Sequence, residues 1–260
     1  YTAKIREALG RLAALGAKQP LVAIQHANNE TGVIQPLEEL APVVRKAGGI
    51  LLADCAQTAG KLALPDADII AVSAHKLGGP KGIGALIVKD GVDIASLRKG
   101  GGQEQGRRPG TENVPAIVGG GLAAEVALRE MAQRIAHTAK LQKRLYEGLK
   151  SKIAYIKFNG PEPGPKRIST NLNISTEFIE GEGQLLLCDM NGIAVASGSS
   201  CVSKSLKISH VLAAIGRGAE PHHFAVGQHQ FETEHMIRCH AVLQRVRAAG
   251  IGRHVAADGA

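Results

Sequence analysis

Four short apolar runs, each with polar side chains at or just after its end, restrict the possible folds of this chain more than any other feature. Short aliphatic runs bounded by turn residues are typical of buried strands. We therefore predict buried strands at Leu21–Gln25, Ile50–Ala53, Ile69–Ser73 and Gly84–Val88.

Helical patterns accompany these runs. Residues 3–16 repeat apolar side chains at helical spacing, and residues 36–47 form a second pattern that ends at Gly48 and Gly49. Strands and helices in this order predict an α/β fold, a mainly parallel sheet covered by helices. Ligands bind beyond the carboxyl ends of such strands, so the polar residues that follow the runs are the candidate site.

The rest of the chain indicates a second, smaller part. A glycine-rich segment is followed by a long helical pattern from about Val114 to Lys150. We predict a first domain over residues 1–113, a linking helix over 114–150 and a smaller α+β C-terminal domain over 151–260. The elements expected in the last part are strands at Asn171–Ile174 and Gly192–Ala196 and a helix that begins near Ser205.

Composition excludes several classes of function. The net charge is +8, but the basic residues are scattered, which argues against nucleic-acid binding. No apolar run approaches the ~20 residues of a membrane span, and no signal peptide is recognisable. The cysteines show no CxxC spacing, so we expect no zinc site and a reduced, cytoplasmic chain. They are Cys55, Cys188, Cys201 and Cys239.

Lys76 is the first candidate catalytic residue, because it follows a predicted strand and lies among small residues. Burial lowers the pKa of a lysine and makes its amine nucleophilic, which suits a Schiff base with a carbonyl group. The alternative, from this residue alone, is a solvated lysine in a turn.

Asp54, at the end of the neighbouring predicted strand, favours the catalytic interpretation of Lys76. A buried aspartate must be paired or hydrogen-bonded, and a pyridoxal cofactor needs an acid that keeps its ring nitrogen protonated. The two residues would then hold opposite sides of one flat ring. Further contacts are predicted from Gln57 and Asn29 to the ring hydroxyl and from Ser73 and His75 to a phosphate group.

Cys201 is the candidate nucleophile. Small residues surround it, and a thiol exposed near Lys204 and Lys207 would have a lowered pKa and react as a thiolate. An ordinary loop cysteine is the alternative. Cys55 and Cys188 adjoin apolar runs and are predicted to be buried packing residues.

Five segments, in this order, closely resemble the motifs of NifS/IscS-type cysteine desulfurases, which belong to the class V aminotransferase branch of fold type I pyridoxal-phosphate enzymes. The similarity runs from about residue 20 to 216. The segments are HANNETGVIQP, DCAQTAGK, SAHKLGGPKGIGAL, GGGQEQGRRPGTEN and SGSSCVSKSLKISHVL.

The resemblance implies a role for each candidate residue. It assigns the covalent cofactor link to Lys76, the pyridine nitrogen to Asp54, the ring oxygen to Asn29 and Gln57, and the phosphate to Ser73, His75 and, across a homodimer interface, Thr111. It makes Cys201 the nucleophile that takes the substrate's sulfur, and also a transient ligand of an iron–sulfur cluster.

The activity implied is that of a pyridoxal-phosphate-dependent cysteine desulfurase that converts L-cysteine to L-alanine. Sulfur would remain on Cys201 as a persulfide and pass to a NifU/IscU-type scaffold protein for iron–sulfur cluster assembly. The resemblance implies a cytoplasmic homodimer. Residues 1–113 would then be the C-terminal part of the large cofactor-binding domain.

Two departures from the family pattern stand out. The family's N-terminal portion, with a phosphate loop and a ring-stacking histidine, is absent, so we interpret the chain as N-terminally truncated. Residues 217–260 also depart from the pattern: they lack the arginine that binds the substrate carboxylate and hold six of the ten histidines. A frameshift or a divergent tail is our hypothesis for this segment.

Two other functions stay open. The chain could be a related class V enzyme, such as a selenocysteine lyase or an aminotransferase, although an aminotransferase needs no loop thiol like that of Cys201. It could also be a non-catalytic, truncated paralogue that docks on a scaffold protein.

Overall fold

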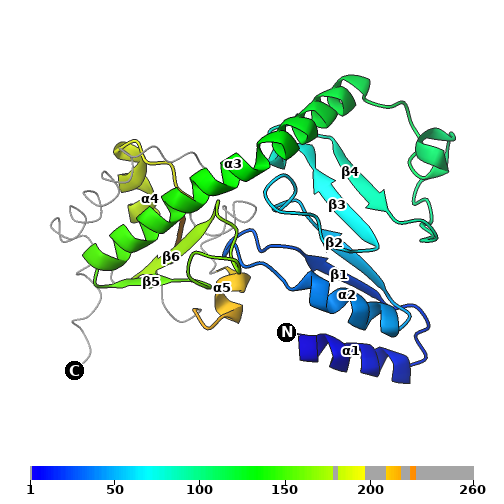
Figure 1. The fold of residues 1–260 in the computed structure, drawn as a ribbon, viewed down its shortest axis with the longest axis horizontal. Coiled ribbons are helices and arrows are strands. Elements are labelled where there is room, and N and C mark those ends of the chain that lie inside the picture. The colour runs from blue at the N-terminus through cyan, green and yellow to red at the C-terminus, as the bar shows by residue number, and fades with distance from the viewer. Residues whose placement is uncertain (1, 178–180, 197–208, 218–222, 227–260) are drawn as a thin grey trace. The chain divides into compact units, whose positions relative to one another are not determined.

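The computed structural model describes residues 2–177, 181–196, 209–217 and 223–226. The chain divides into two compact units, whose elements are labelled in Figure 1. The first unit comprises Tyr1–Ala27 and Gln35–Ala132, and the second comprises Asn28–Ile34 and Gln133–Ala260.

The first unit is built on a four-stranded sheet in the order β1-β2-β3-β4. The strands are β1 (Leu21–Gln25), β2 (Ile50–Asp54), β3 (Ile69–Ser73) and β4 (Gly84–Val88). β1, β2 and β3 are parallel, while β4 pairs with β3 in the antiparallel direction. All four predicted strands are present, and the predicted mainly parallel α/β fold is confirmed.

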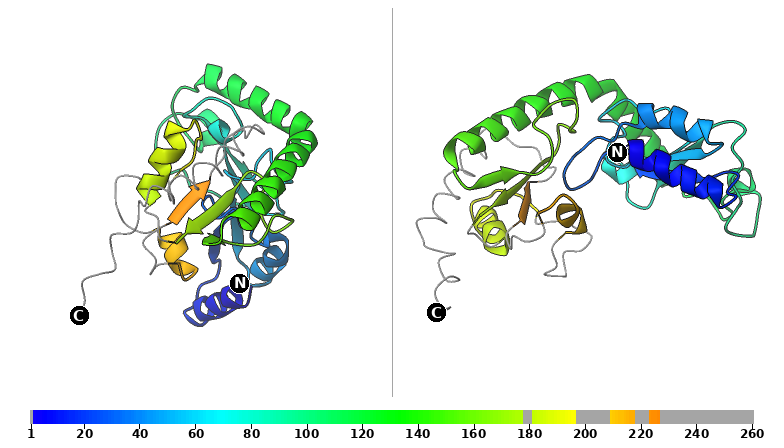
Figure 2. Two further views of the ribbon diagram at one scale, coloured as in Figure 1. Left: turned by 90° about the vertical axis from the view of Figure 1, so that its left-hand side faces the viewer. Right: turned by 90° about the horizontal axis from the view of Figure 1, so that it is seen from below.

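Two helices complete the packing of this sheet. α2 (Leu37–Lys46) has acidic residues in its first turn and basic residues in its last, which complements the helix dipole. It packs against β2, and α1 (Thr2–Ala14) packs in turn against α2. Both views of Figure 2 show the two helices side by side.

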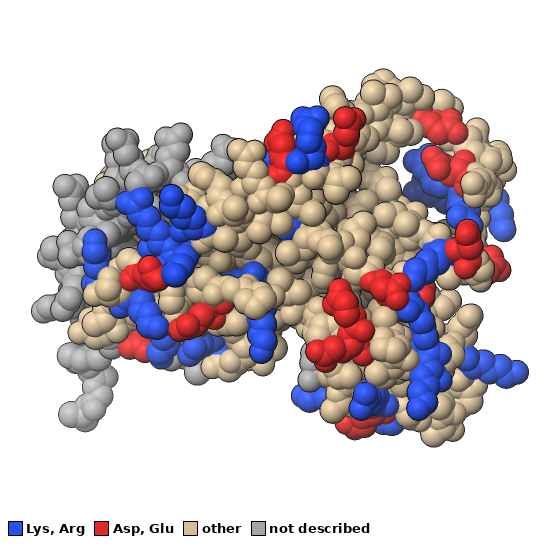
Figure 3. Space-filling model, viewed as in Figure 1, with Lys and Arg blue, Asp and Glu red and all other residues tan. Residues whose placement is uncertain are grey.

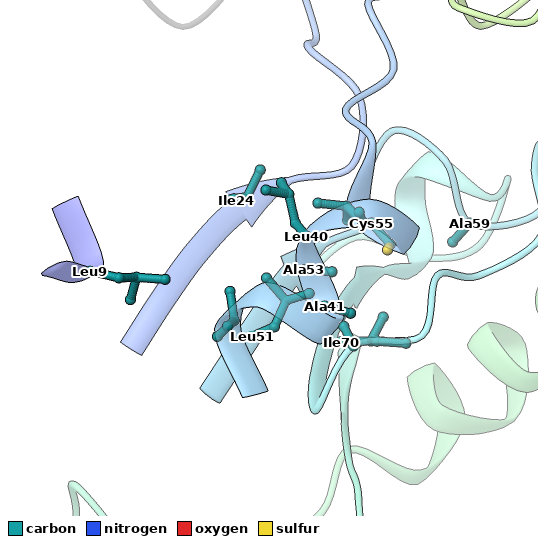
Figure 4. Packing of buried hydrophobic residues seen from close by; sticks show 12 residues of the cluster. Leu9, Ile24, Leu40, Ala41, Leu51, Ala53, Cys55, Ala59 and Ile70 are labelled. Atoms are coloured by element: carbon teal, nitrogen blue, oxygen red, sulfur yellow. The ribbon is translucent and has the colours of Figure 1, made fainter. Parts of the chain in front are cut away.

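The core of the first unit is aliphatic, as the scarcity of aromatic residues predicts. Leu40 and Val44 of α2 are fully buried with Leu51 of β2, and Leu9 brings α1 into the same cluster (Figure 4). β1 and β4 are less buried than expected: Ile24 is the one buried residue of β1, and β4 has none. The reason is that both are edge strands of this sheet, covered on fewer sides than β2.

A 39-residue helix, α3 (Val114–Lys152), contributes to both units. Before it lies η2 (Gln103–Gly106), a short 3-10 segment in which Glu104 and Gln105 have positive φ angles. The predicted long helix is confirmed. In the part of the chain that the structure describes, no helix has the length and apolarity needed to cross a membrane.

The second unit contains a three-stranded antiparallel sheet in the order β5-β6-β7. Its elements are β5 (Ile156–Phe158), β6 (Leu172–Thr176), β7 (His223–Val226), α4 (Gly181–Met190) and α5 (His210–Ala214). Its core joins the second part of α3 to the sheet through Leu145, Leu149 and Ile174.

Sequence patterns predicted this second sheet only in part. The run Asn171–Ile174 corresponds to β6, whereas β5 and β7 were not predicted. Gly192–Ala196 is not a strand: Gly192 closes the turn after α4 with a φ of 71°, and Ile193 packs into the core. The helix expected to begin near Ser205 begins instead at His210, because Ser209 has non-helical backbone angles and caps its N-terminus.

Candidate active site

Asp54 marks the carboxyl edge of the parallel strands. As the last residue of β2, it lies beside Gln25 of β1 and Ala71 of β3 in the strand register. Its Oδ1 accepts a hydrogen bond from the backbone N–H of Ala56 at 2.9 Å. The side chain is exposed rather than buried, because the strand ends there and opens toward solvent.

The residues after β3 lie at the same edge. β3 ends at Ser73 and continues directly into a single 3-10 turn, η1 (Ala74–Lys76). The Ser73 hydroxyl and Nδ1 of His75 are 2.8 Å apart and share a hydrogen bond. Lys76 is half-buried, whereas His75 is exposed. This turn therefore presents an amine and a polar pair to one side of the sheet.

Small residues hold the turn of Lys76 in place, as the sequence predicts. The backbone N–H of Gly79 bonds to the carbonyl of Ala74 at 2.9 Å. A Cβ added at Gly79 would lie 3.1 Å from the Cβ of Ala123 in α3, and one added at Gly120 would lie 3.5 Å from the Cβ of Ala74. Larger side chains would push α3 away from this turn.

Lys61 is a further charged residue at this edge that the sequence interpretation missed. Its Nζ is buried and has no hydrogen-bond partner. Burial, and then the charge of Lys76, lowers the pKa of Lys61 to about 8. The signal was present in the motif DCAQTAGK, but a lysine after glycine in a turn is normally solvated.

These residues fit a pyridoxal-phosphate group. Lys76 could supply an amine for the aldehyde, Asp54 an acid for the ring nitrogen, and Ser73 with His75 hydrogen-bonding groups for a phosphate. The buried, unpartnered ammonium of Lys61 also indicates that this edge suits an anionic ligand, because an unpaired buried cation is unfavourable.

Asn29 belongs to the second unit. It lies exposed in the segment Asn28–Ile34, whose turn is held by Asn28: its Oδ1 accepts from the N–H groups of Glu30 and Thr31 at 3.0 and 2.8 Å. The predicted contact of Asn29 with the same ligand as Asp54 therefore stays a prediction.

Glu30, whose side chain is buried, holds the segment Asn28–Ile34 in place within the second unit. The carbonyl oxygen of Glu30 accepts hydrogen bonds from Nδ2 of Asn171 and of Asn173, at 2.8 and 3.1 Å. Its carboxylate accepts one from the Ser209 hydroxyl at 2.5 Å. Residues separated by more than a hundred positions thus determine where the turn with Asn29 is held.

The structure gives fewer contacts for the remaining candidate site residues. Gln57 lies half-buried in the turn after β2, where it interacts with other groups. Thr111 is exposed between η2 and α3. Cys201 lies outside the described residues, as do Lys204, Lys207 and Cys239, so the catalytic and metal-binding roles of Cys201 stay predictions.

Two cysteines are buried as predicted. Burial raises the pKa of the Cys55 thiol, and it raises that of Cys188 to about 11. Cys55 lies 3.9 Å from Nδ1 of His26, which is hydrogen-bonded to Thr58 and whose pKa burial lowers. Neither thiol is a reactive thiolate. Across the described residues, no group of three or more histidine, cysteine or acidic side chains could hold a metal ion.

Comparison with known proteins agrees with this site. Residues 7–218 match the aminotransferase class V family. A cysteine desulfurase IscS of Clostridium botulinum is 42% identical over 207 residues, which cover 78% of this chain and 52% of that protein. A cysteine desulfurase IscS of Anaeromyxobacter is 41% identical over 247 residues, covering 90% of this chain and 60% of that protein.

Solved structures show the same likeness. The X-ray structure of a NifS-like protein from Rickettsia africae has a TM-score of 0.79 and 27% identity, covering 92% of this chain and 66% of that chain. The chain therefore belongs to the aminotransferase class V family, whose members use pyridoxal 5′-phosphate. Its likeness is to the NifS/IscS-type cysteine desulfurases of that family.

The chain spans about half the length of the first curated relatives that it matches. The similarity was expected to end near Gly216. The family model does end close by, at residue 218, but a match over 247 residues is longer than 216 and must continue beyond that position. For the Anaeromyxobacter relative, this expectation was wrong.

Proposed function

We propose that this chain carries part of a pyridoxal-phosphate-dependent cysteine desulfurase, which converts L-cysteine to L-alanine. The observation that carries the proposal is the placement of Lys76 and Asp54. Asp54 ends β2 and Lys76 follows the adjacent parallel strand β3, in a chain 42% identical over 207 residues to a cysteine desulfurase.

The proposed roles follow from the chemistry of each side chain. When bound, the cofactor supplies an electron-accepting ring that weakens bonds at the substrate's α-carbon. Asp54 would hold a proton at the ring nitrogen, and the amine of Lys76 would hold the cofactor at its aldehyde and move a proton at the substrate. Ser73 and His75 bind the phosphate, Asn29 and Gln57 orient the ring oxygen, and Thr111 reaches the phosphate of a partner subunit.

Cys201 is the proposed sulfur acceptor. Its thiolate attacks the sulfur of the bound cysteine, an S–S bond forms and the C–S bond breaks. The electron pair of that bond stays with the carbon fragment, which gains a proton and leaves as alanine. The persulfide on Cys201 then passes to a NifU/IscU-type scaffold, where Cys201 also serves as a transient iron–sulfur ligand.

The setting proposed is a cytoplasmic homodimer. The two described cysteines are free, in keeping with a reducing compartment, and a dimer is needed for Thr111 to reach a second site. We propose no nucleic-acid or membrane partner. On the face shown in Figure 3, basic and acidic side chains are interspersed among the described residues, unlike a nucleic-acid-binding stripe.

The cofactor proposal is tested by adding pyridoxal 5′-phosphate to the purified chain and following the absorbance of the Schiff base. We expect this band in the wild type and in Lys81→Met, which removes an exposed lysine close to Lys76 in sequence. Lys76→Ala should abolish it. A chain with no such band, or a band that persists in Lys76→Ala, would contradict the role of Lys76.

The sulfur-transfer proposal needs a separate measurement. We expect cysteine to yield alanine and a persulfide on Cys201, detected by mass spectrometry of the intact chain. Cys201→Ser should lose the persulfide but keep the Schiff base. Alanine production that survives this substitution would instead indicate another class V reaction.

A further inference from the structure

Asn29 is an exposed residue in a turn that is otherwise buried. Within residues 28–32, every residue except Asn29 is buried, so the turn presents one side chain and encloses the others. Packing therefore holds the backbone on both sides of Asn29. An exposed side chain on a backbone held in this way can meet a ligand without the entropic cost of first ordering a loop.

Two side-chain amides bind the carbonyl group next to Asn29. Nδ2 of Asn171, just before β6, and Nδ2 of Asn173, within β6, both donate to the carbonyl oxygen of Glu30, at 2.8 and 3.1 Å. The two asparagines are buried, with 5% and 0% of their surface exposed. A carbonyl oxygen has two lone pairs, so the two amides together fix the direction of this peptide group.

Backbone bonds hold the same turn against the segment that precedes β6. The N–H of Ile168 donates to the carbonyl of Gly32 at 2.9 Å, and the N–H of Ile34 donates to that of Lys166 at 3.0 Å. A Cβ added at Gly32 would lie 2.7 Å from Oδ1 of Asn171. The turn is therefore packed directly on the side chain of Asn171.

The side chain of Asn171 is poorly suited to a role in packing alone. Its Oδ1 is buried without a hydrogen-bond partner, which is unfavourable. Among the described residues, its Nδ2 makes one hydrogen bond, to the carbonyl of Glu30. An aliphatic side chain would fill the same space without an unpaired oxygen, so what the amide contributes is the position of that carbonyl.

We propose that Asn171 and Asn173 are positioning residues that hold the turn of Asn29 for its contact with the ring oxygen of the cofactor. This inference rests on the proposed function, in which Asn29 meets that oxygen. Because both asparagines are buried, they act through Asn29 and not on a ligand. Asn171 is the residue to test, since Asn173 also accepts a bond from Nδ2 of Asn159 at 2.7 Å and its loss would disturb the core.

The first measurement needs no cofactor. Hydrogen exchange of a peptide that spans residues 26–34 reports the N–H groups that bond to Asn28 within the turn. We expect Asn171→Ala and Asn171→Leu to speed this exchange about fivefold, the factor for one net hydrogen bond. Asn191→Ala is the matched control, because Nδ2 of Asn191 bonds to a backbone carbonyl elsewhere in the second unit, that of Leu187. It should leave this exchange unchanged.

The second measurement compares pyridoxal 5′-phosphate with 3-deoxypyridoxal 5′-phosphate, which lacks the ring hydroxyl. Absorbance titration gives a dissociation constant for each ligand. We expect Asn29→Ala to weaken binding of the first ligand about tenfold, and Asn171→Ala and Asn171→Leu to weaken it about threefold. Binding of the second ligand should not change, whereas a merely structural loss would weaken both. Adding Asn171→Ala to Asn29→Ala should cause no further loss, because no contact then remains to be positioned.

Three results would overturn the proposal: unchanged hydrogen exchange in Asn171→Ala, equal losses of affinity for the two ligands, or an effect in Asn171→Ala that is absent from Asn171→Leu. The last result would assign the effect to a cavity instead of a hydrogen bond. If the wild type binds neither ligand, the proposed function fails, and the role toward the cofactor fails with it. Hydrogen exchange still decides by itself whether Asn171 holds the turn, and an unchanged rate rejects that as well.

Discussion

Burial of Lys61 lowers the free energy of unfolding by an amount that depends on pH. Its pKa in the folded chain is about 8, below the ordinary value of ~10.4. Below pH 8, Lys61 is protonated in both states and its burial opposes folding. Between these two pKa values the unfolded state binds more protons than the folded state, so the free energy of unfolding rises with pH.

Replacing Lys61 with Met should therefore stabilise the chain without its cofactor. We expect a gain of ~2 kcal/mol at pH 7, because an apolar side chain of similar length needs no partner. The gain should shrink as the pH approaches ~10.4. Urea unfolding at several pH values measures this, with Lys81→Met as the exposed control. A gain that does not change with pH would contradict the assigned cause.

Ser73 should contribute to binding of the cofactor's phosphate group rather than of its pyridine ring. Loss of a hydrogen bond to a charged group costs ~2 kcal/mol, so we expect Ser73→Ala to weaken pyridoxal 5′-phosphate binding about 30-fold. Binding of pyridoxal, which lacks the phosphate, should change little. Ser96→Ala is the control, because the Ser96 hydroxyl bonds to backbone carbonyls in the same unit. Equal losses for both ligands would place Ser73 away from the phosphate.

At the scale of elements, Gly60 joins the turn after β2 to its neighbours. Its φ is 69°, and an added Cβ would lie 2.8 Å from Cβ of Ala127 and 3.0 Å from Cδ2 of Leu77. Gly60→Ala should therefore combine backbone strain with a steric clash.

Gly91 provides a matched control for that substitution. Its φ is 82°, yet nothing lies within 4 Å of an added Cβ. We expect Gly91→Ala to cost ~1 kcal/mol from strain alone, and Gly60→Ala to cost ~3 kcal/mol once overpacking is included. Urea unfolding should separate the two variants. Equal costs would show that the turn of Lys61 adjusts freely.

Ser209 links α5 to the segment of Asn29. Its hydroxyl accepts from the N–H groups of Val211 and Leu212 and donates to the carboxylate of Glu30. We expect Ser209→Ala to destabilise the second unit by ~2 kcal/mol, because the helix loses its cap and a buried carboxylate loses a donor.

Two controls accompany this prediction. Ser209→Thr keeps a hydroxyl and should recover most of the stability. Ser151→Ala removes an exposed hydroxyl that bonds to one carbonyl of its own helix, and it should be nearly neutral. A Ser209→Thr variant as unstable as Ser209→Ala would show that shape, not hydrogen bonding, matters there.

At the scale of the whole molecule, burial should protect both described cysteines from reagents in solution. Cys55 and Cys188 are both below 3% exposed. We expect a thiol reagent to label neither one in the folded chain and both after unfolding in urea. Peptide mass spectrometry after timed labelling gives the rate at each cysteine. Rapid native labelling of either residue would contradict the packing of its core.

Local sequence patterns were sufficient to predict the strands of the first unit. β1, β3 and β4 have the predicted bounds, and β2 extends by one residue to Asp54. Short aliphatic runs bounded by turns form strands because they satisfy burial and backbone propensity together. The polar residues at their ends identified Lys76 and Asp54 for the same reason: parallel strands bring their carboxyl ends to one edge.

The roles assigned to other residues needed more than local pattern. Thr111 entered through motif resemblance, and the role of Cys201 rests mostly on it, since nothing in their immediate sequence places them near Lys76. Gly192–Ala196 has the composition of a strand, yet its apolar side chain Ile193 is buried by packing against the core instead of by strand pairing.

Composition and spacing were thus enough to predict the α/β class and the ends of the strands in the first unit, because these depend on neighbours along the chain. The partners of Glu30, the pairing of β7 with β6 and the burial of the Lys61 amine depend on tertiary packing. Contacts between distant residues determine solvation, and solvation decides whether a lysine in a turn is an ordinary surface group or, like Lys61, a buried amine with a lowered pKa.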